Sequence, residues 1–209
     1  MMDKTDFSHY INKERLIATF TELIRINSPS FKEREIGDLL AKRLEGVGFL
    51  VDFQEYDKSF NIIAFKKGAI PDTPPLLLSG HMDTIEPTEG IRFSIEDGVI
   101  RTTGNTVLGA DDKSALAQIL EVLTVIQEKD LPHGDLEVVF TSAEENGLFG
   151  AKNLDFTRLR SKHALVLDSG GSVGNIVIAA PTHYTYEMKI TGKAAHAGIE
   201  PEKGISAIR

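Results

Sequence analysis

The sequence contains no cysteine, so it offers no disulfide, no thiolate zinc site and no cysteine nucleophile. Basic residues are in deficit: 23 lysines and arginines stand against 31 aspartates and glutamates, and the formal net charge of -8 argues against a nucleic-acid or anionic-membrane surface. No apolar run is long enough to span a bilayer, and the N-terminus has no apolar signal core. We therefore expect a cytoplasmic protein in which histidine and carboxylate side chains hold any metal.

The 209 residues are enough to bury a core, and 41% hydrophobic with 26% charged residues is ordinary for a globular domain. Apolar runs predict strands that alternate with segments of helical periodicity. Strands are expected at 49–53, 61–65, 76–78, 136–142 and 164–167, and helices at 12–26, 32–44, 112–128 and 148–154. This alternation predicts an α/β fold with a mostly parallel sheet flanked by helices.

The character of the chain changes beyond Pro181. Residues 184–190 alternate between apolar and polar side chains, as a half-exposed strand should. We therefore predict two domains, a larger one over residues 1–181 and the beginning of a second, small α+β domain over residues 182–209.

One stretch organises the larger domain: three leucines, 76 to 78, run into Ser79-Gly80-His81-Met82-Asp83. Ligands of open α/β sheets bind at the carboxyl ends of the strands, where this stretch ends. His81 can offer one ring nitrogen to a metal while Asp83 holds the other ring N–H. Taken alone, a His-x-Asp sequence is more often a turn with a satisfied histidine.

Acidic residues follow at three further element ends, Asp111-Asp112, Glu144-Glu145 and Asp168. One imidazole and several carboxylates at one sheet edge suit Zn²⁺, Mn²⁺ or Co²⁺, and a bridging carboxylate can hold two ions about 3.5–4 Å apart. An adjacent Glu-Glu pair can supply both a ligand and a base from one loop. Helix capping or turn chemistry explains each acidic pair alone, but the four together favour a functional site.

Five motifs in order carry a resemblance to a known family: Gly80-His81-Met82-Asp83-Thr84, Gly109-Ala110-Asp111-Asp112-Lys113, Ser142-Ala143-Glu144-Glu145-Asn146-Gly147, Leu167-Asp168-Ser169-Gly170-Gly171 and Gly192-Lys193-Ala194-Ala195-His196-Ala197-Gly198. The chain resembles the M20 metallopeptidases, and most closely the peptidase T-like tripeptide aminopeptidases. The resemblance covers nearly the whole chain. It implies a zinc-exopeptidase-like catalytic domain followed by the start of a lid or dimerisation domain.

The resemblance also implies metal ligands. His81 and Asp168 would bind the first of two Zn²⁺ ions, Asp111 would bridge both ions, and Glu145 would bind the second. Mn²⁺ or Co²⁺ could replace zinc, and the Asp111–Asp112 peptide bond is expected to be cis.

Three catalytic roles follow from the same resemblance. Glu144 would be the general base, Asp83 would orient His81, and His196 of the lid would stabilise the oxyanion, often from a partner subunit of a homodimer. The relatives continue beyond this sequence and supply a last histidine to the second metal, so we expect either a fragment of a longer enzyme or a truncated product.

The predicted function is hydrolysis of small peptides by metal-activated water, of aminopeptidase or tripeptidase type. An alternative keeps the site and changes the substrate to an N-acyl amino acid or to a C-terminal peptide bond. A third reading, from another class, is an inactive metal-binding fragment, which the missing second-metal histidine favours. No nucleic-acid or membrane partner is expected.

Overall fold

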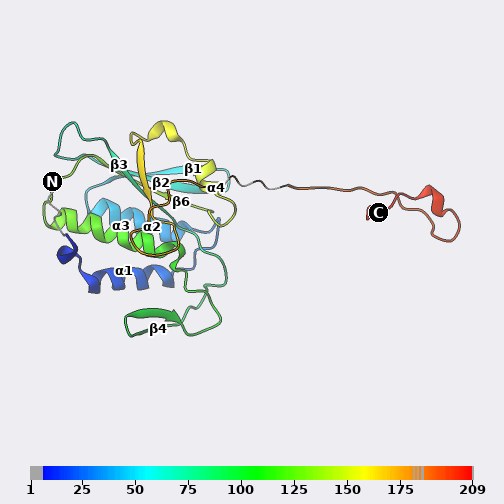
Figure 1. Ribbon diagram of the computed structural model, residues 1–209, viewed down its shortest axis with the longest axis horizontal. Coiled ribbons are helices and arrows are strands. Elements are labelled where there is room, and N and C mark those ends of the chain that lie inside the picture. Colours follow the sequence, from blue (N-terminus) through cyan, green and yellow to red (C-terminus); the bar gives the residue numbers. More distant parts are fainter. Residues whose placement is uncertain (1–6, 181, 183, 185, 209) are drawn as a thin grey trace. The chain divides into compact units, whose positions relative to one another are not determined.

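A computed structural model describes residues 7–180, 182, 184 and 186–208 (Figure 1). The chain divides into two compact units, Met1–Gly170 and Gly171–Arg209, each of which is described by itself. None of the helices among the described residues is both long and apolar enough to cross a membrane.

A five-stranded sheet forms the centre of the first unit. Its strands are β1 (Leu50–Tyr56), β2 (Ser59–Lys66), β3 (Leu76–His81), β6 (Leu136–Thr141) and β7 (His163–Val166). Their order is β1-β2-β6-β3-β7; β6, β3 and β7 are parallel, whereas β1 and β2 are antiparallel to their neighbours. A separate hairpin, β4 (Phe93–Glu96) with β5 (Val99–Thr102), turns at Asp97-Gly98, where both residues have positive φ.

Helices cover one face of this sheet, and the segment around residues 149–159 covers part of the other. Figure 1 shows α1 (Lys13–Arg25), α2 (Arg34–Gly46) and α3 (Ala110–Glu128) together on one side. The short α4 (Phe149–Lys152) contacts β2. The remaining elements are the 3-10 turns η1 (Ser8–Tyr10), η2 (Phe156–Arg158) and η3 (Pro201–Lys203). The predicted α/β class is confirmed, and the sheet is parallel over the three strands that carry the site.

The core follows from the period-two alternation of the strands. On one face, Ile62, Leu78 and Val138 pack into the large cluster formed with the three long helices. Their neighbours Ile63, Leu77 and Val139 form a smaller cluster on the opposite face. Because both faces are covered, these strands are apolar at successive positions, which is the pattern that made them visible in the sequence.

An ion-pair network joins α1 to α3. The guanidinium of Arg15 donates to both carboxylate oxygens of Glu121, at 2.6 and 2.9 Å, and to Glu128 at 2.7 Å. The side chain of Glu121 is 2% exposed, and the amide of Asn12, the N-cap of α1, also donates to it.

We expect Arg15→Met to lower the free energy of unfolding by about 3 kcal/mol, because it leaves the buried carboxylate of Glu121 without its cation. Urea unfolding followed by circular dichroism measures this. The control is Glu128→Gln, which removes the half-exposed partner and should cost less than about 1 kcal/mol. Equal losses in the two variants would contradict a special contribution from the buried pair.

Two expectations concern the second unit. The strand predicted over residues 184–190 is wrong for the described part of that segment, which forms no strand. Alternation is a local signal, whereas a strand also needs a hydrogen-bonded partner, and the segment pairs with none in the described chain. The domain division between residues 181 and 182 stays a prediction, and Pro181 lies outside the described residues.

Candidate metal centre

His81 is the last residue of β3, at the centre of the parallel part of the sheet. Its side chain is 2% exposed. The ring Nδ1 lies 2.9 Å from the backbone oxygen of Asp83 and 3.4 Å from its carboxylate. A proton on Nδ1 is therefore held by Asp83, which leaves Nε2 to face the acidic residues.

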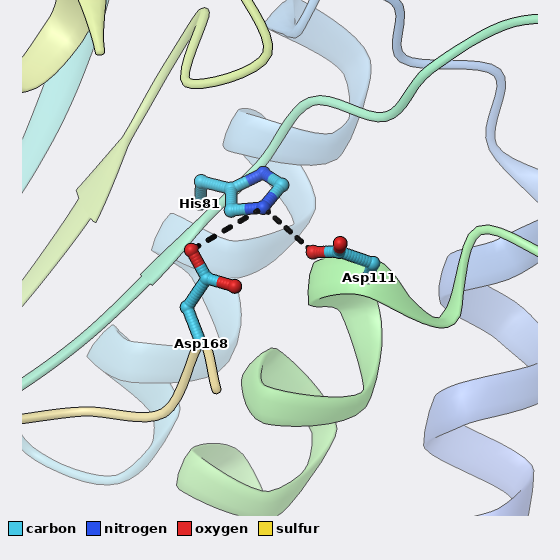
Figure 2. A group of neighbouring side chains, drawn as sticks. All are labelled: His81, Asp111 and Asp168. Atoms are coloured by element: carbon cyan, nitrogen blue, oxygen red, sulfur yellow. Dashed lines mark hydrogen bonds and ion pairs between the residues drawn. The ribbon is translucent and has the colours of Figure 1, made fainter. Parts of the chain in front are cut away.

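Two carboxylates face that nitrogen (Figure 2). Nε2 of His81 lies 3.0 Å from Asp111 Oδ1 and 4.0 Å from Asp168 Oδ2. Asp111 comes from the first turn of α3, and Asp168 comes from the loop that follows β7. Figure 2 shows both side chains pointing toward the ring, so three segments far apart in the sequence meet here.

The start of α3 is shaped to present Asp111. Gly109 is left-handed at φ 70°, and the Asp111–Asp112 peptide bond is cis, as the resemblance implies. Asp112 is buried and accepts a hydrogen bond from the backbone amide of His81 at 3.1 Å. A Cβ on Gly80 would lie 2.6 Å from the Asp112 carboxylate, so only glycine fits beside it.

The loop after β6 brings Glu144 and Glu145 to the same place. One ligand atom each from His81, Glu144 and Glu145 lie within 4.8 Å of one another, as do those from His81, Asp111 and Asp168. Asp83, fully buried, accepts the backbone amides of Glu144 at 2.9 Å and Glu145 at 3.2 Å. Asp83 therefore orients the glutamate loop as well as the His81 ring.

The charges of the cluster influence one another. Burial alone would lower the pKa of His81, but the Asp83 hydrogen bond and the charges of Asp112 and Asp83 raise it to about 10. Burial raises the pKa of Glu144 and of Glu145, and the charge of Asp111 raises the pKa of Glu145 further. The charge of His81 opposes both shifts. The pocket thus favours positive charge at its centre.

A glycine contact supports the glutamate loop from behind. The amide of Gly150 in α4 donates to the backbone oxygen of Ser142 at 2.9 Å, and a Cβ on Gly150 would lie 2.2 Å from that oxygen. Asn61 bridges the two, because its side chain donates to Gly150 O and accepts from Ser142 N.

We expect Gly150→Ala to lower the free energy of unfolding by about 1–3 kcal/mol, because the added methyl group forces the β6 loop away from α4. Thermal and urea unfolding test this. Gly46→Ala is the matched control: it lies at the end of α2 with no atom within 4 Å of the new Cβ, and should be neutral or stabilising. Equal destabilisation by both changes would rule out the steric explanation.

The structure brings six predicted site residues together: His81, Asp83, Asp111, Glu144, Glu145 and Asp168. His196 belongs to residues 171–209, a unit described by itself, so its place at the site stays a prediction.

Sequence reasoning missed two residues that contact the site. Ser30 donates to the Asp83 carboxylate at 2.7 Å, and Glu33 accepts the backbone amide of Ala143 at 2.9 Å. The only sequence signal was a Ser-x-x-Glu pattern before α2, which ordinarily indicates a capping box.

Comparison with known proteins supports a peptidase. The family model that matches residues 61–197 is that of peptidase family M28. The uncharacterised protein YqjE of Bacillus subtilis is 42% identical over 205 residues, which cover 95% of this chain and 54% of that protein. Aminopeptidase PepT of Bacillus cereus has a TM-score of 0.81 at 41% identity, over 95% of this chain and 55% of PepT. A tripeptidase of Staphylococcus aureus gives the same TM-score at 35% identity, over 95% of this chain and 54% of that enzyme.

The helix-flanked sheet, the histidine and carboxylates gathered at its strand ends and these comparisons together group the chain with the peptidases. The matched model covers well over half of the sequence, and the chain belongs to peptidase family M28. The matching model is thus M28, a family related to but different from the M20 expected from the motifs. The chain spans about half the length of the relatives it matches.

Proposed function

We propose that the chain carries the catalytic centre of a metal-dependent exopeptidase of aminopeptidase or tripeptidase type, which removes residues from small peptides with Glu144 as the general base. The observation that carries this proposal is the convergence on the His81 ring of carboxylates from three separate segments, two of which face Nε2. The similarity to an aminopeptidase and a tripeptidase supports the reaction type.

The side chains present fit a divalent metal. Both groups of ligand atoms around His81 contain one nitrogen and two carboxylates within 4.8 Å, a donor set that suits zinc, manganese or cobalt. His81, Asp111 and Asp168 would hold one ion, and Glu145 with Asp111 a second. When bound, the ions supply a water of lowered pKa and polarise the scissile carbonyl.

Glu144 is suited to take a proton from the attacking water. Its side chain is partly exposed, so solvent and substrate can reach it, and burial raises its pKa from the ordinary glutamate value. Its backbone amide is fixed by the buried carboxylate of Asp83, which keeps the side chain beside His81. The proton accepted by Glu144 would pass to the departing amine.

The finer assignment, a peptidase T-like enzyme with two zinc ions, belongs to the same proposal. It is supported by the five motifs and by the resemblance to PepT at 41% identity. A contribution of His196 to the oxyanion, and a homodimer formed through the lid, are proposed with it.

A comparison of three related substrates tests this function. The full 209-residue chain, loaded with Zn²⁺, Mn²⁺ or Co²⁺, is offered a free tripeptide, its N-acetylated form and its C-terminal amide. We expect release of the N-terminal residue from the free tripeptide and from its amide, and no cleavage of the N-acetylated peptide. Preferred cleavage of the N-acylated substrate would replace the aminopeptidase assignment by an amidohydrolase. Metal binding without any turnover would favour the inactive fragment.

A further inference from the structure

Glu33, at the N-cap of α2, is a buried carboxylate that the proposed mechanism does not use. It is 1% exposed. One carboxylate oxygen accepts the backbone amides of Phe31 and Ala143, each at 2.9 Å, and the other accepts the hydroxyl of Ser59 at 2.9 Å. Its bond to Ala143 crosses 110 residues of sequence and ends one residue before Glu144.

Three consecutive amides of this loop thus donate to two buried carboxylates. Glu33 accepts Ala143, and Asp83 accepts Glu144 and Glu145. Ala143 is fully buried and has a left-handed φ of 48°, a conformation that turns successive amides toward one anion-binding side. An apolar side chain in place of Glu33 would leave the buried Ala143 amide without its acceptor.

A cation does not explain why the carboxylate is buried. Within the described part of the chain, no lysine, arginine or histidine forms an ion pair with Glu33. The donors from other residues are the Phe31 amide, the Ser59 hydroxyl and the Ala143 amide, and only the last belongs to the site. Burying a carboxylate without a cation is costly, and the hydrogen-bond acceptor that Glu33 provides to the loop offsets part of this cost.

We propose that Glu33 is a positioning residue for Glu144 and Glu145. By holding the Ala143 amide it fixes the left-handed turn from which both side chains point to His81, while Asp83 fixes the next two amides. The segment between α1 and α2 also carries Ser30, which donates to Asp83 at 2.7 Å. This segment therefore supplies one of the two carboxylates that hold the loop and a hydrogen bond to the other. This inference rests on the proposed peptidase function for its catalytic consequence.

The test compares Glu33→Asp, Glu33→Gln and Ser59→Ala in the full chain. Glu33→Asp withdraws the carboxylate by one methylene from Ala143, and we expect kcat to fall about 10–100-fold with KM little changed. Glu33→Gln keeps an acceptor oxygen for both amides, so its kcat should stay within about 3-fold of the wild-type value. Ser59→Ala removes the contact to the other oxygen, together with a contact to Tyr56, but leaves the Ala143 amide its acceptor, and should also stay within about 3-fold.

Hydrogen exchange of the Ala143, Glu144 and Glu145 amides gives a readout independent of metal and activity. In the wild type we expect protection of all three, and in Glu33→Asp at least about 10-fold faster exchange there, with no change in α1. Free exchange of the Ala143 amide in the wild type, or a folded Glu33→Asp with wild-type kcat and exchange, would overturn the inference. If the wild type cleaves no peptide, the proposed function fails while the exchange data still decide the role of Glu33.

Discussion

Replacing Glu144 by glutamine should reduce peptide hydrolysis by about 10²–10⁴-fold while leaving the metal content unchanged. Glutamine preserves the shape of the side chain but cannot accept a proton from water. The backbone contact from Glu144 to Asp83 does not involve the side chain, so the loop should stay in place. Steady-state kinetics on a tripeptide and elemental analysis of the dialysed protein measure the two quantities.

The neighbouring glutamate gives the sharpest comparison. Glu145→Gln should lower the metal content, because we assign Glu145 as a ligand of the second ion. Exposed Glu89 provides the control, and Glu89→Gln should change neither quantity. Full activity in Glu144→Gln would remove the proposed base, and loss of metal in that variant would show that Glu144 acts as a ligand instead.

Replacing His81 by alanine should lower the metal content by at least one ion per chain and reduce hydrolysis by about 10³-fold or more. The imidazole is the only nitrogen donor in either group of ligand atoms found among the described residues, and both groups share it. Losing the ions removes several kcal/mol of transition-state stabilisation, and 1.36 kcal/mol corresponds to a tenfold change in rate.

His163→Ala is the matched control for this change, because His163 is an exposed histidine on β7. It should keep the wild-type metal content and activity. Circular dichroism must show that His81→Ala is folded, since removal of the ring leaves buried Asp83 without one of its partners. An unchanged metal-to-protein ratio in a folded His81→Ala protein would show that His81 is not a ligand.

Apolar periodicity was sufficient to predict most elements of the first unit. The leucines of 76–78 lie in β3, and the helical spacing after Asp112 lies in α3, because a buried face imposes its period on the sequence. The antiparallel pairing of β2 with β6 could not be predicted in this way. Strand order depends on contacts between distant segments, and the apolar pattern of a buried strand is the same in either direction.

The candidate site was predictable as a set of residue types, because its acidic residues lie at the start or just after the end of elements that could be located. The supporting contacts were not predictable. Ser30 and Glu33 have the spacing of two residues that cap one another across a helix start, yet each binds another segment instead. A spacing rule describes neighbours along the chain, whereas Glu33 and Ala143 are 110 residues apart in the sequence and meet only through the tertiary fold.

The two strands that precede His81 and Asp168 differ in how firmly the sheet holds them. β7 pairs only with β3 in the described chain, and its side chains are exposed, whereas β3 lies between two strands. Edge segments open at lower free energy than central ones. Of two residues that would bind an ion, Asp168 would therefore move away more often than His81. The residence time of such an ion would be set by the local opening of β7, which needs less free energy than the unfolding of the whole domain.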